Sequence, residues 1–151
     1  MNSADDLHNK AMLLAQKGDR LLEAKKPGQA ITLFQKAYLS EKQAAERLPR
    51  TDQNEPSRSI LYCSAASLAL QGALYKEAFM AASKGLAGRP SIRIKKSLLQ
   101  IQSDAKSRIK DKRTSRNRML LKNKERQMLL RSAALRKKKK LLAKDTLKHA
   151  G

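Results

Sequence analysis

At 151 residues, the chain is long enough for one ordinary domain with an appendage and too short for two large domains. Its 34 Lys and Arg outnumber 13 Asp and Glu, giving a formal net charge of +21, and aromatic residues make up only 3%. This composition argues against a wholly globular chain and against an enzyme pocket lined by aromatic side chains. Six Gly and four Pro are too few for a turn-rich all-β fold, so we predict an all-α protein.

The sequence also bears on the compartment. The single Cys63 excludes an intramolecular disulfide and a multi-cysteine metal site, as expected in a reducing compartment. The first ten residues carry two carboxylates and lack the apolar run of a signal peptide, and no later stretch has the roughly 18 apolar residues of a membrane span. We therefore expect a cytoplasmic protein. In a eukaryotic cell, the four lysines at 137–140 would be a candidate nuclear address.

The charge is divided unevenly along the chain. Residues 1–88 hold 12 Lys and Arg against 9 Asp and Glu, whereas residues 89–151 hold 22 against 4. The first part has the charge balance of a foldable domain, while the second repels itself unless salt or an anionic partner screens it. We predict a helical domain over residues 1–112 and a basic C-terminal arm over residues 113–151.

The N-terminal part shows helical periodicity. Ser3 and Asp6 have the spacing of a capping box, and the apolar stripe behind them predicts a helix over about residues 3–24. A second stripe starts with a proline suited to a first helical turn and predicts a helix over about residues 27–48. Glu41 interrupts this second stripe.

Two further helices follow a polar loop. Residues 50–56 read as the loop, and Ser57 is placed to cap a third helix. A fourth helix ends before Gly88 and Pro90, which stop a helix in the usual order. Small residues dominate the inward faces, which suits closely packed antiparallel helices. They are Ala30, Ala37, Ala65, Ala66, Ala69, Ala78, Ala81 and Ala82.

A short pattern recurs within these helices. Pro27-x2-Ala30-x3-Phe34-x2-Ala37 is followed, 48 residues on, by Ala78-x3-Ala82-x2-Gly85-x4-Pro90. A small residue, Gly18 or Ala66, lies twelve positions before the first alanine of each. This pattern resembles the tetratricopeptide repeat, and residues 56–69 are similar to small bacterial tetratricopeptide-like proteins of unassigned role. The offset departs from the usual repeat of about 34 residues. The resemblance implies two antiparallel helix hairpins over about residues 11–90.

The same helices resemble a second family. Segments 18–24, 29–31 and 36–37 are similar to the three-helix MIT module, which binds helical tails of membrane-remodelling proteins. A fourth inward-facing helix favours the tetratricopeptide family. Both families bind peptides or helices and are not catalytic, so each resemblance implies a partner groove. The carboxylate clamp of some tetratricopeptide proteins is absent, because Ala15 and Asp19 occupy its Lys and Asn positions. The predicted groove residues are Leu14, Gly18, Leu21, Tyr62 and Ala66.

The sequence of the basic C-terminal region also predicts a helix. Residues 91–149 are mostly good helix formers without Gly or Pro. A stripe of Ile94, Leu98, Ile101, Ala105 and Ile109 predicts a capping helix over about residues 91–109 that packs on the domain. Ser and Thr within residues 113–117 predict an interruption, because they compete for backbone hydrogen bonds. Beyond it we expect a long basic arm, amphipathic and helical or partly disordered, that becomes ordered on a partner.

A coiled coil is an alternative for the arm. Leu121, Met128, Leu135 and Leu142 recur every seven residues, as in a leucine zipper. Charged residues would then occupy most of the other core positions, which disfavours a stable zipper.

The charge of the arm predicts a polyanionic partner. Nucleic acid comes first, because Lys and Arg displace counterions from phosphates without any sequence readout. Base recognition is unsupported, because the arm has no aromatic residue for stacking. An anionic membrane surface, an acidic protein and a merely solvated tail are the other interpretations. The predicted polyanion-binding residues are Arg113, Arg116, Arg118, Lys122, Lys124, Arg126, Arg131, Arg136, Lys137, Lys138, Lys139, Lys140 and Lys144.

The sequence offers no catalytic, cofactor or metal site. His8 and His149 lie at opposite ends and are expected to be exposed, while Cys63 is expected to be a buried structural thiol. We therefore predict a non-enzymatic adaptor without a cofactor. Its groove would bind a protein partner, as a helix or peptide, and its arm would bind nucleic acid. The alternative is a protein–protein scaffold whose arm docks on an acidic protein or an anionic membrane, with no nucleic-acid role.

Overall fold

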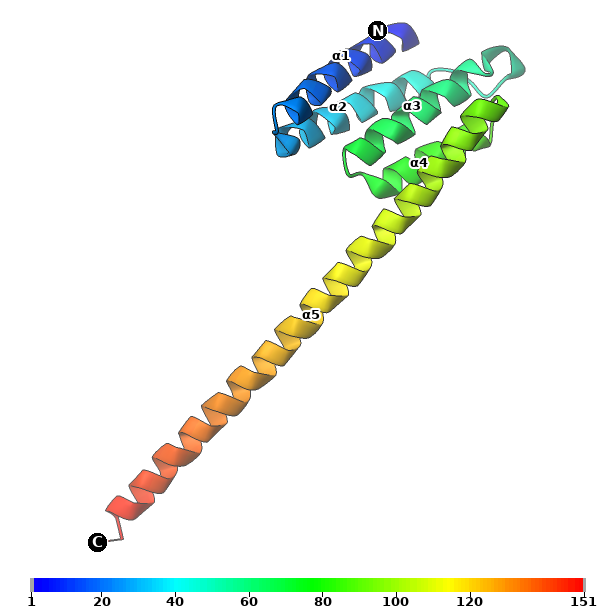
Figure 1. The fold of residues 1–151 in the computed structure, drawn as a ribbon. Coiled ribbons are helices and arrows are strands. Elements are labelled where there is room, and N and C mark those ends of the chain that lie inside the picture. Colours follow the sequence, from blue (N-terminus) through cyan, green and yellow to red (C-terminus); the bar gives the residue numbers. More distant parts are fainter. Residues whose placement is uncertain (1, 151) are drawn as a thin grey trace. The chain divides into compact units, whose positions relative to one another are not determined.

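The protein is all-helical, as predicted, in the computed structural model, which describes residues 2–150 (Figure 1). No strand occurs among the described residues, and none of their helices is both long enough and apolar enough to cross a lipid bilayer. The chain divides into two units between Lys110 and Asp111. The elements are α1 (Ala4–Glu23), α2 (Pro27–Glu46), the 3₁₀ turn η1 (Asp52–Asn54), α3 (Ser57–Gln71), α4 (Tyr75–Leu86) and α5 (Ile92–Lys148).

The predicted capping box begins α1. The Ser3 hydroxyl oxygen accepts a hydrogen bond from the Asp6 backbone N–H at 3.1 Å, and the Asp6 carboxylate accepts one from the Ser3 backbone N–H at 2.9 Å. The bond from the Ser3 N–H, helped by the Ser3 hydroxyl, holds the pKa of Asp6 below its ordinary value. At the next helix, Pro27 occupies the first turn, where its missing N–H costs no hydrogen bond.

The start of α3 differs from the prediction. Ser57 is the first helical residue and does not cap the helix, because Pro56 occupies the N-cap position without a side-chain cap bond. The Glu55 carboxylate acts instead, accepting hydrogen bonds from the Ser59 backbone N–H at 3.3 Å and from its hydroxyl at 2.6 Å. The Ser59 hydroxyl also lies 3.2 Å from the Gly85 carbonyl oxygen. The loop before α3 is thereby tied to the end of α4.

The core of the first unit is built from small side chains and close helix contacts. All eight alanines predicted to face inward are buried. The fully buried ring of Phe34 lies against Gly18, where an added Cβ would stand 2.9 Å from two ring carbons. An added Cβ at Gly85 would meet Leu98 of α5 at the same distance. These positions need a residue without a side chain, because their helices approach so closely.

The connections from α1 to α2 and from α3 to α4 are built alike. Residues 24–26 form the first and residues 72–74 the second, and the middle residue of each has a positive φ, 57° at Lys25 and 56° at Ala73. In both, the three backbone N–H groups bond to carbonyls four, three and five residues back. This is the Schellman end of a helix. The two copies are 48 residues apart, which is also the offset of the sequence pattern.

Glu41, which interrupts the apolar stripe of α2, is fully buried. Both of its carboxylate oxygens lie 3.0 Å from Nδ1 of His8 on α1. The expectation that His8 is exposed is therefore wrong, because its ring, 40% exposed, turns inward to the carboxylate. A buried carboxylate requires such a hydrogen-bonding partner. His149 is exposed, as expected.

The first part of α5 belongs to the first unit and packs on it. Leu98 and Ala105 are fully buried, and Ile94 and Ile101 are partly buried against the core. The predicted interruption at residues 113–117 is wrong, since α5 is helical without a break from Ile92 to Lys148. The Lys and Arg residues around the Ser and Thr are good helix formers, and their summed propensity outweighs two weaker positions.

The paired helix ends yield a stability prediction. Replacement of Lys25 or Ala73 by Gly is expected to raise the free energy of unfolding by about 0.5–1 kcal/mol each, because a positive φ strains any residue with a Cβ. Replacement of Ala24, whose φ is −79°, by Gly is expected to lower it by a similar amount. Urea denaturation measures all three variants. An equal effect of Gly at Ala24 and at Ala73 would contradict the assignment.

Candidate functional site

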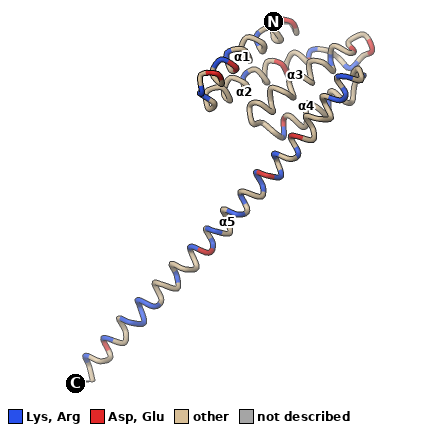
Figure 2. Tube along the Cα trace, viewed as in Figure 1, with Lys and Arg blue, Asp and Glu red and all other residues tan. Residues whose placement is uncertain are grey.

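The second unit carries the densest charge in the protein. From residue 111 to the end of the chain, 15 Lys and Arg stand against 3 Asp and Glu. Figure 2 shows these basic residues recurring along the whole of that part of α5. Every described residue from Asp111 on is exposed. The charge is therefore accessible to an anionic partner along α5 from Asp111 to Lys148.

All thirteen predicted polyanion-binding residues lie on this helix and are exposed. The first unit contains ion pairs, for example between Lys84 and Glu46 at 3.7 Å and between Arg89 and Asp52 at 3.2 Å. None of the thirteen forms an ion pair with a described carboxylate. These thirteen cations thus have no carboxylate partner within the described part of the chain.

Large apolar side chains accompany the cations but do not share a face. Successive helical residues point about 100° apart, so a consecutive triplet such as residues 119–121 covers most of the circumference. The predicted amphipathic character is absent for this reason. Ten such side chains are each at least 51% exposed: Met119, Leu120, Leu121, Met128, Leu129, Leu130, Leu135, Leu141, Leu142 and Leu147.

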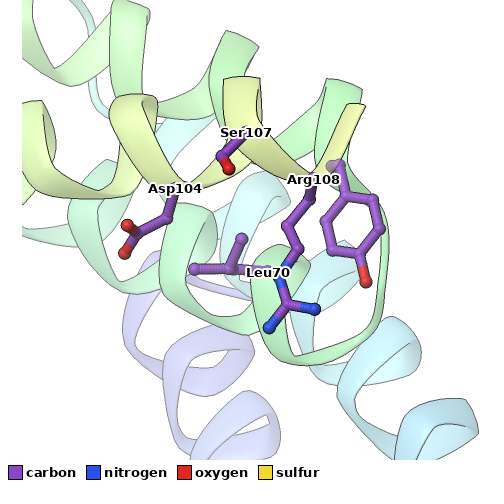
Figure 3. Close-up of a pocket in the computed structure, with 5 residues that line it drawn as sticks. Leu70, Asp104, Ser107 and Arg108 are labelled. Carbon is purple, nitrogen blue, oxygen red and sulfur yellow. The ribbon is translucent and has the colours of Figure 1, made fainter. Parts of the chain in front are cut away.

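A cleft of about 330 Å³ lies in the first unit, where the end of α3 and the start of α4 meet α5. Figure 3 shows Asp104, Ser107 and Arg108 reaching into it from α5, with Leu70 opposite. Tyr75 completes the lining. The Asp104 carboxylate accepts a hydrogen bond from Nε2 of Gln100 at 2.9 Å, so that acid is engaged within its own helix.

A second cleft, of about 240 Å³, lies beside η1. The Arg89 guanidinium pairs with Asp52 at 3.2 Å, and the Arg50 guanidinium donates to the Ala87 carbonyl. Glu55 is nearly buried and pairs with Arg58 at 3.8 Å. Arg89 pairs with Asp52 and Arg50 bonds to the backbone, so we interpret the cleft as the anchorage of the loop, while Oε1 of Glu55 is buried without a hydrogen-bond partner among the described residues.

A third cleft, of about 220 Å³, opens between α2 and α4. Tyr38, Lys42, Tyr62, Glu77, Met80, Ala81 and Lys84 line it. The Arg58 guanidinium lies 4.7 Å from the centre of the Tyr62 ring, within cation–π range. Burial raises the pKa of Tyr38, and the charges of Glu77 and Glu46 raise it further. Burial also raises the pKa of Tyr62, against the opposing charge of Arg58.

The structure does not gather the predicted groove residues at an open surface. Gly18, Tyr62 and Ala66 are buried, while Leu14 and Leu21 are partly buried against the core. Of these five, Tyr62 lines one of the clefts described above, and that cleft lies between α2 and α4. Leu14, Gly18 and Leu21 lie on α1, which packs against α2, and Ala66 lies in the core on α3. Lys42, Glu77 and Lys84 of the cleft were not predicted. Of the three, only Lys42 gives a local signal, because it lies four residues, about one helical turn, from Tyr38; the place of Glu77 and Lys84 at the cleft depends on how α4 packs.

Two chemical features of the first unit bear on catalysis. Cys63 is half-buried on α3, and burial raises the pKa of its thiol, which lowers the fraction of reactive thiolate. The part of the chain that the structure describes contains no group of three or more His, Cys, Asp or Glu placed to hold a metal ion.

The chain matches no family model, no curated protein and no solved structure.

The two cleft tyrosines lead to a pH prediction. Because folding raises their pKa, the unfolded chain releases these phenol protons first, from the ordinary value of 10.0 upward. The free energy of unfolding therefore falls as the pH rises through that range. We predict that a Tyr38→Phe/Tyr62→Phe variant loses less stability than the original protein between about pH 9 and about pH 11, measured by urea denaturation. Identical losses in both proteins would contradict the assignment.

Proposed function

We propose that the protein is a non-enzymatic adaptor whose residues 113–151 form a basic arm that binds nucleic acid without sequence preference. The observation that carries this proposal is the set of thirteen exposed cations on one helix, none paired with a described carboxylate. When such cations contact phosphates, they release the counterions that are condensed on the nucleic acid, and this release favours binding. The gain in free energy is electrostatic, so it depends on phosphate density and not on the order of the bases.

The arrangement of the lysines favours attraction without a fixed orientation. Residues 137–140 are four successive lysines, and successive helical residues point about 100° apart. Together they cover about 300° of the circumference. One of them therefore faces a phosphate surface whichever way the helix is turned. With no aromatic residue in the arm to stack on a base, this pattern supports binding to the backbone alone.

The distribution of apolar residues disfavours a membrane surface. A helix that lies in a lipid interface needs an apolar face opposite a charged face. Here Leu129 and Leu130 are adjacent and exposed, and so point in different directions. Any orientation of the helix in the interface would bury several lysines in the hydrocarbon region, at substantial cost in free energy.

We assign the first unit to a tetratricopeptide-like module that binds a protein partner. The matching Schellman ends of α1 and α3, 48 residues apart, support two equivalent helix hairpins. The cleft between α2 and α4 is the proposed partner site, because it combines two aromatic rings with Lys and Glu side chains at the surface. Aromatic residues at the base of a groove are frequent anchors for a bound peptide.

A gel-shift titration of the full-length protein with duplex DNA, at about 50 and about 200 mM salt, tests the arm. The original protein is expected to lose affinity steeply with salt. Replacement of all four lysines at 137–140 by Gln is expected to weaken binding at least tenfold and to reduce the salt slope by about 2–4. The matched control replaces four exposed lysines of the first unit, Lys10, Lys17, Lys25 and Lys26, and is expected to change the affinity less than about threefold.

If both variants lost the same amount of affinity for duplex DNA, the result would contradict the proposal that the arm binds nucleic acid. Sedimentation with vesicles of anionic lipid separates the alternatives. Strong binding to the vesicles, combined with no binding to DNA, would favour the scaffold that docks on a membrane. No binding to either would leave an acidic protein as the partner of the arm and would contradict the nucleic-acid role.

A further inference from the structure

The cations of the arm surround its helix. Between Arg113 and Lys148, fourteen Lys and Arg are exposed, namely the thirteen predicted polyanion-binding residues and Lys148. At about 100° per residue, no sector of the circumference wider than about 60° is without one of them. The helix therefore has no side from which an anionic partner would meet no positive charge.

This distribution holds along the length of the arm. Residues 113–130 and residues 131–148 each make about five helical turns, and they carry six and eight of the cations. In neither half is a sector wider than about 120° without a cation. The same arrangement thus extends over a helical length of roughly 54 Å.

The large apolar side chains of the arm also point in many directions. Leu129, Leu130 and Leu135 are all exposed, and each points at least about 100° away from the other two. A partner that approaches from one side covers only some of these side chains. A partner that approaches from every side removes all of them from water, which is favourable.

A DNA duplex supplies phosphates on too few sides of such a helix. A helix that lies on the surface of a duplex has phosphates on one side only. The major groove of DNA, about 12 Å wide, admits an α-helix. However, that groove passes once around the duplex in about 34 Å, so a straight helix of roughly 54 Å leaves it. In both arrangements, many of the fourteen cations remain turned toward water.

We infer that the arm is enclosed by a folded RNA, with phosphates around its circumference. This inference rests on the proposed nucleic-acid function and names the class of nucleic acid. In a folded RNA, backbone segments approach one another from different directions, so their phosphates reach cations on every side of an enclosed helix. Loops and bulges of RNA also present unstacked bases, whose apolar faces suit the Leu and Met side chains.

Thiol alkylation of the full-length protein, free and bound to nucleic acid, tests the enclosure. Ser132, Ala133 and Ala134 are successive exposed residues of the arm, and they point about 100° apart. Each is replaced singly by Cys in a protein that carries Cys63→Ala, so that one thiol is present. The matched control is Gln16→Cys in the same background, at an exposed position of α1. Circular dichroism checks that the variants remain helical.

Three nucleic acids are compared in one buffer that contains Mg²⁺: a large ribosomal RNA in its folded form, polyuridylate, and a DNA duplex of about 30 base pairs, roughly three turns. Gel shifts establish that each complex is saturated. With the folded RNA, the alkylation rate is expected to fall at least about tenfold at all three arm positions and less than about twofold at Gln16→Cys. With the duplex, the rate at the arm positions is expected to fall about twofold on average, because a helix lying on a surface leaves about half of its circumference open.

If any one of the three arm positions kept a rate within about twofold of its free value in the folded RNA, the inference would be overturned, since that side of the helix would still face water. Equally strong protection of all three positions by the duplex or by polyuridylate would also overturn it, because a folded RNA would then not be required. Both results would leave the proposed function intact. Failure of the protein to bind any of the three nucleic acids would instead overturn the proposed function itself.

Discussion

Repulsion between like charges governs the second unit. Residues four apart are neighbours on a helix, and Arg136, Lys140, Lys144 and Lys148 form a continuous series of this kind. Each such pair destabilises a helix by about 0.2–0.5 kcal/mol at low salt. None of these four residues forms an ion pair with a described carboxylate, and the large apolar side chains of the second unit are exposed. A partner rich in negative charge therefore stabilises the helix by the same interaction through which the helix binds it.

The first unit depends on a different constraint, the close approach of helix backbones. Gly18 against Phe34 and Gly85 against Leu98 leave no room for a further carbon atom, and alanines fill most of the remaining interface. Its buried charge is confined to groups with partners, such as Glu41 beside His8. The free energy of folding in this unit comes from packing, and that of the proposed binding comes from charge. Charge-neutralising substitutions in the arm are thus suited to test binding without altering the core.

Much of the helical architecture could be predicted from sequence. The stripe and capping residues of α1 are local features, and so is the proline that starts α2, which is why these helices were predicted to within about two residues. The cap at Ser57 was wrong because the carboxylate of Glu55, one residue before the proline, takes that role through tertiary packing against α4. The break at residues 113–117 was wrong because a local preference was weighed without the long helix-forming sequence around it.

Some residues of the candidate sites could likewise be predicted from the sequence, and others could not. Exposure of the thirteen cations followed from the excess of Lys and Arg over Asp and Glu, which the sequence displays directly, whereas the expected amphipathic face was wrong. The groove residues could not be predicted from the sequence in the same way. A small residue such as Gly18 or Ala66 marks a place where two helices cross closely, and such a crossing is buried, so it offers no open surface to a partner. The pairing of His8 with Glu41 and the cleft beside Tyr62 both depend on which helices are neighbours. That information resides in the fold and not in the pattern along one helix.

Amide hydrogen exchange of the full-length protein, with and without duplex DNA at low salt, tests most directly whether the second unit lacks internal neutralisation. The account predicts that amides of residues 113–148 exchange within about tenfold of the unprotected rate in the free protein and slow markedly when the duplex is added, while those of α2 and α3 remain protected throughout. Strong protection of residues 113–148 in the free protein, unchanged by the duplex, would contradict the account.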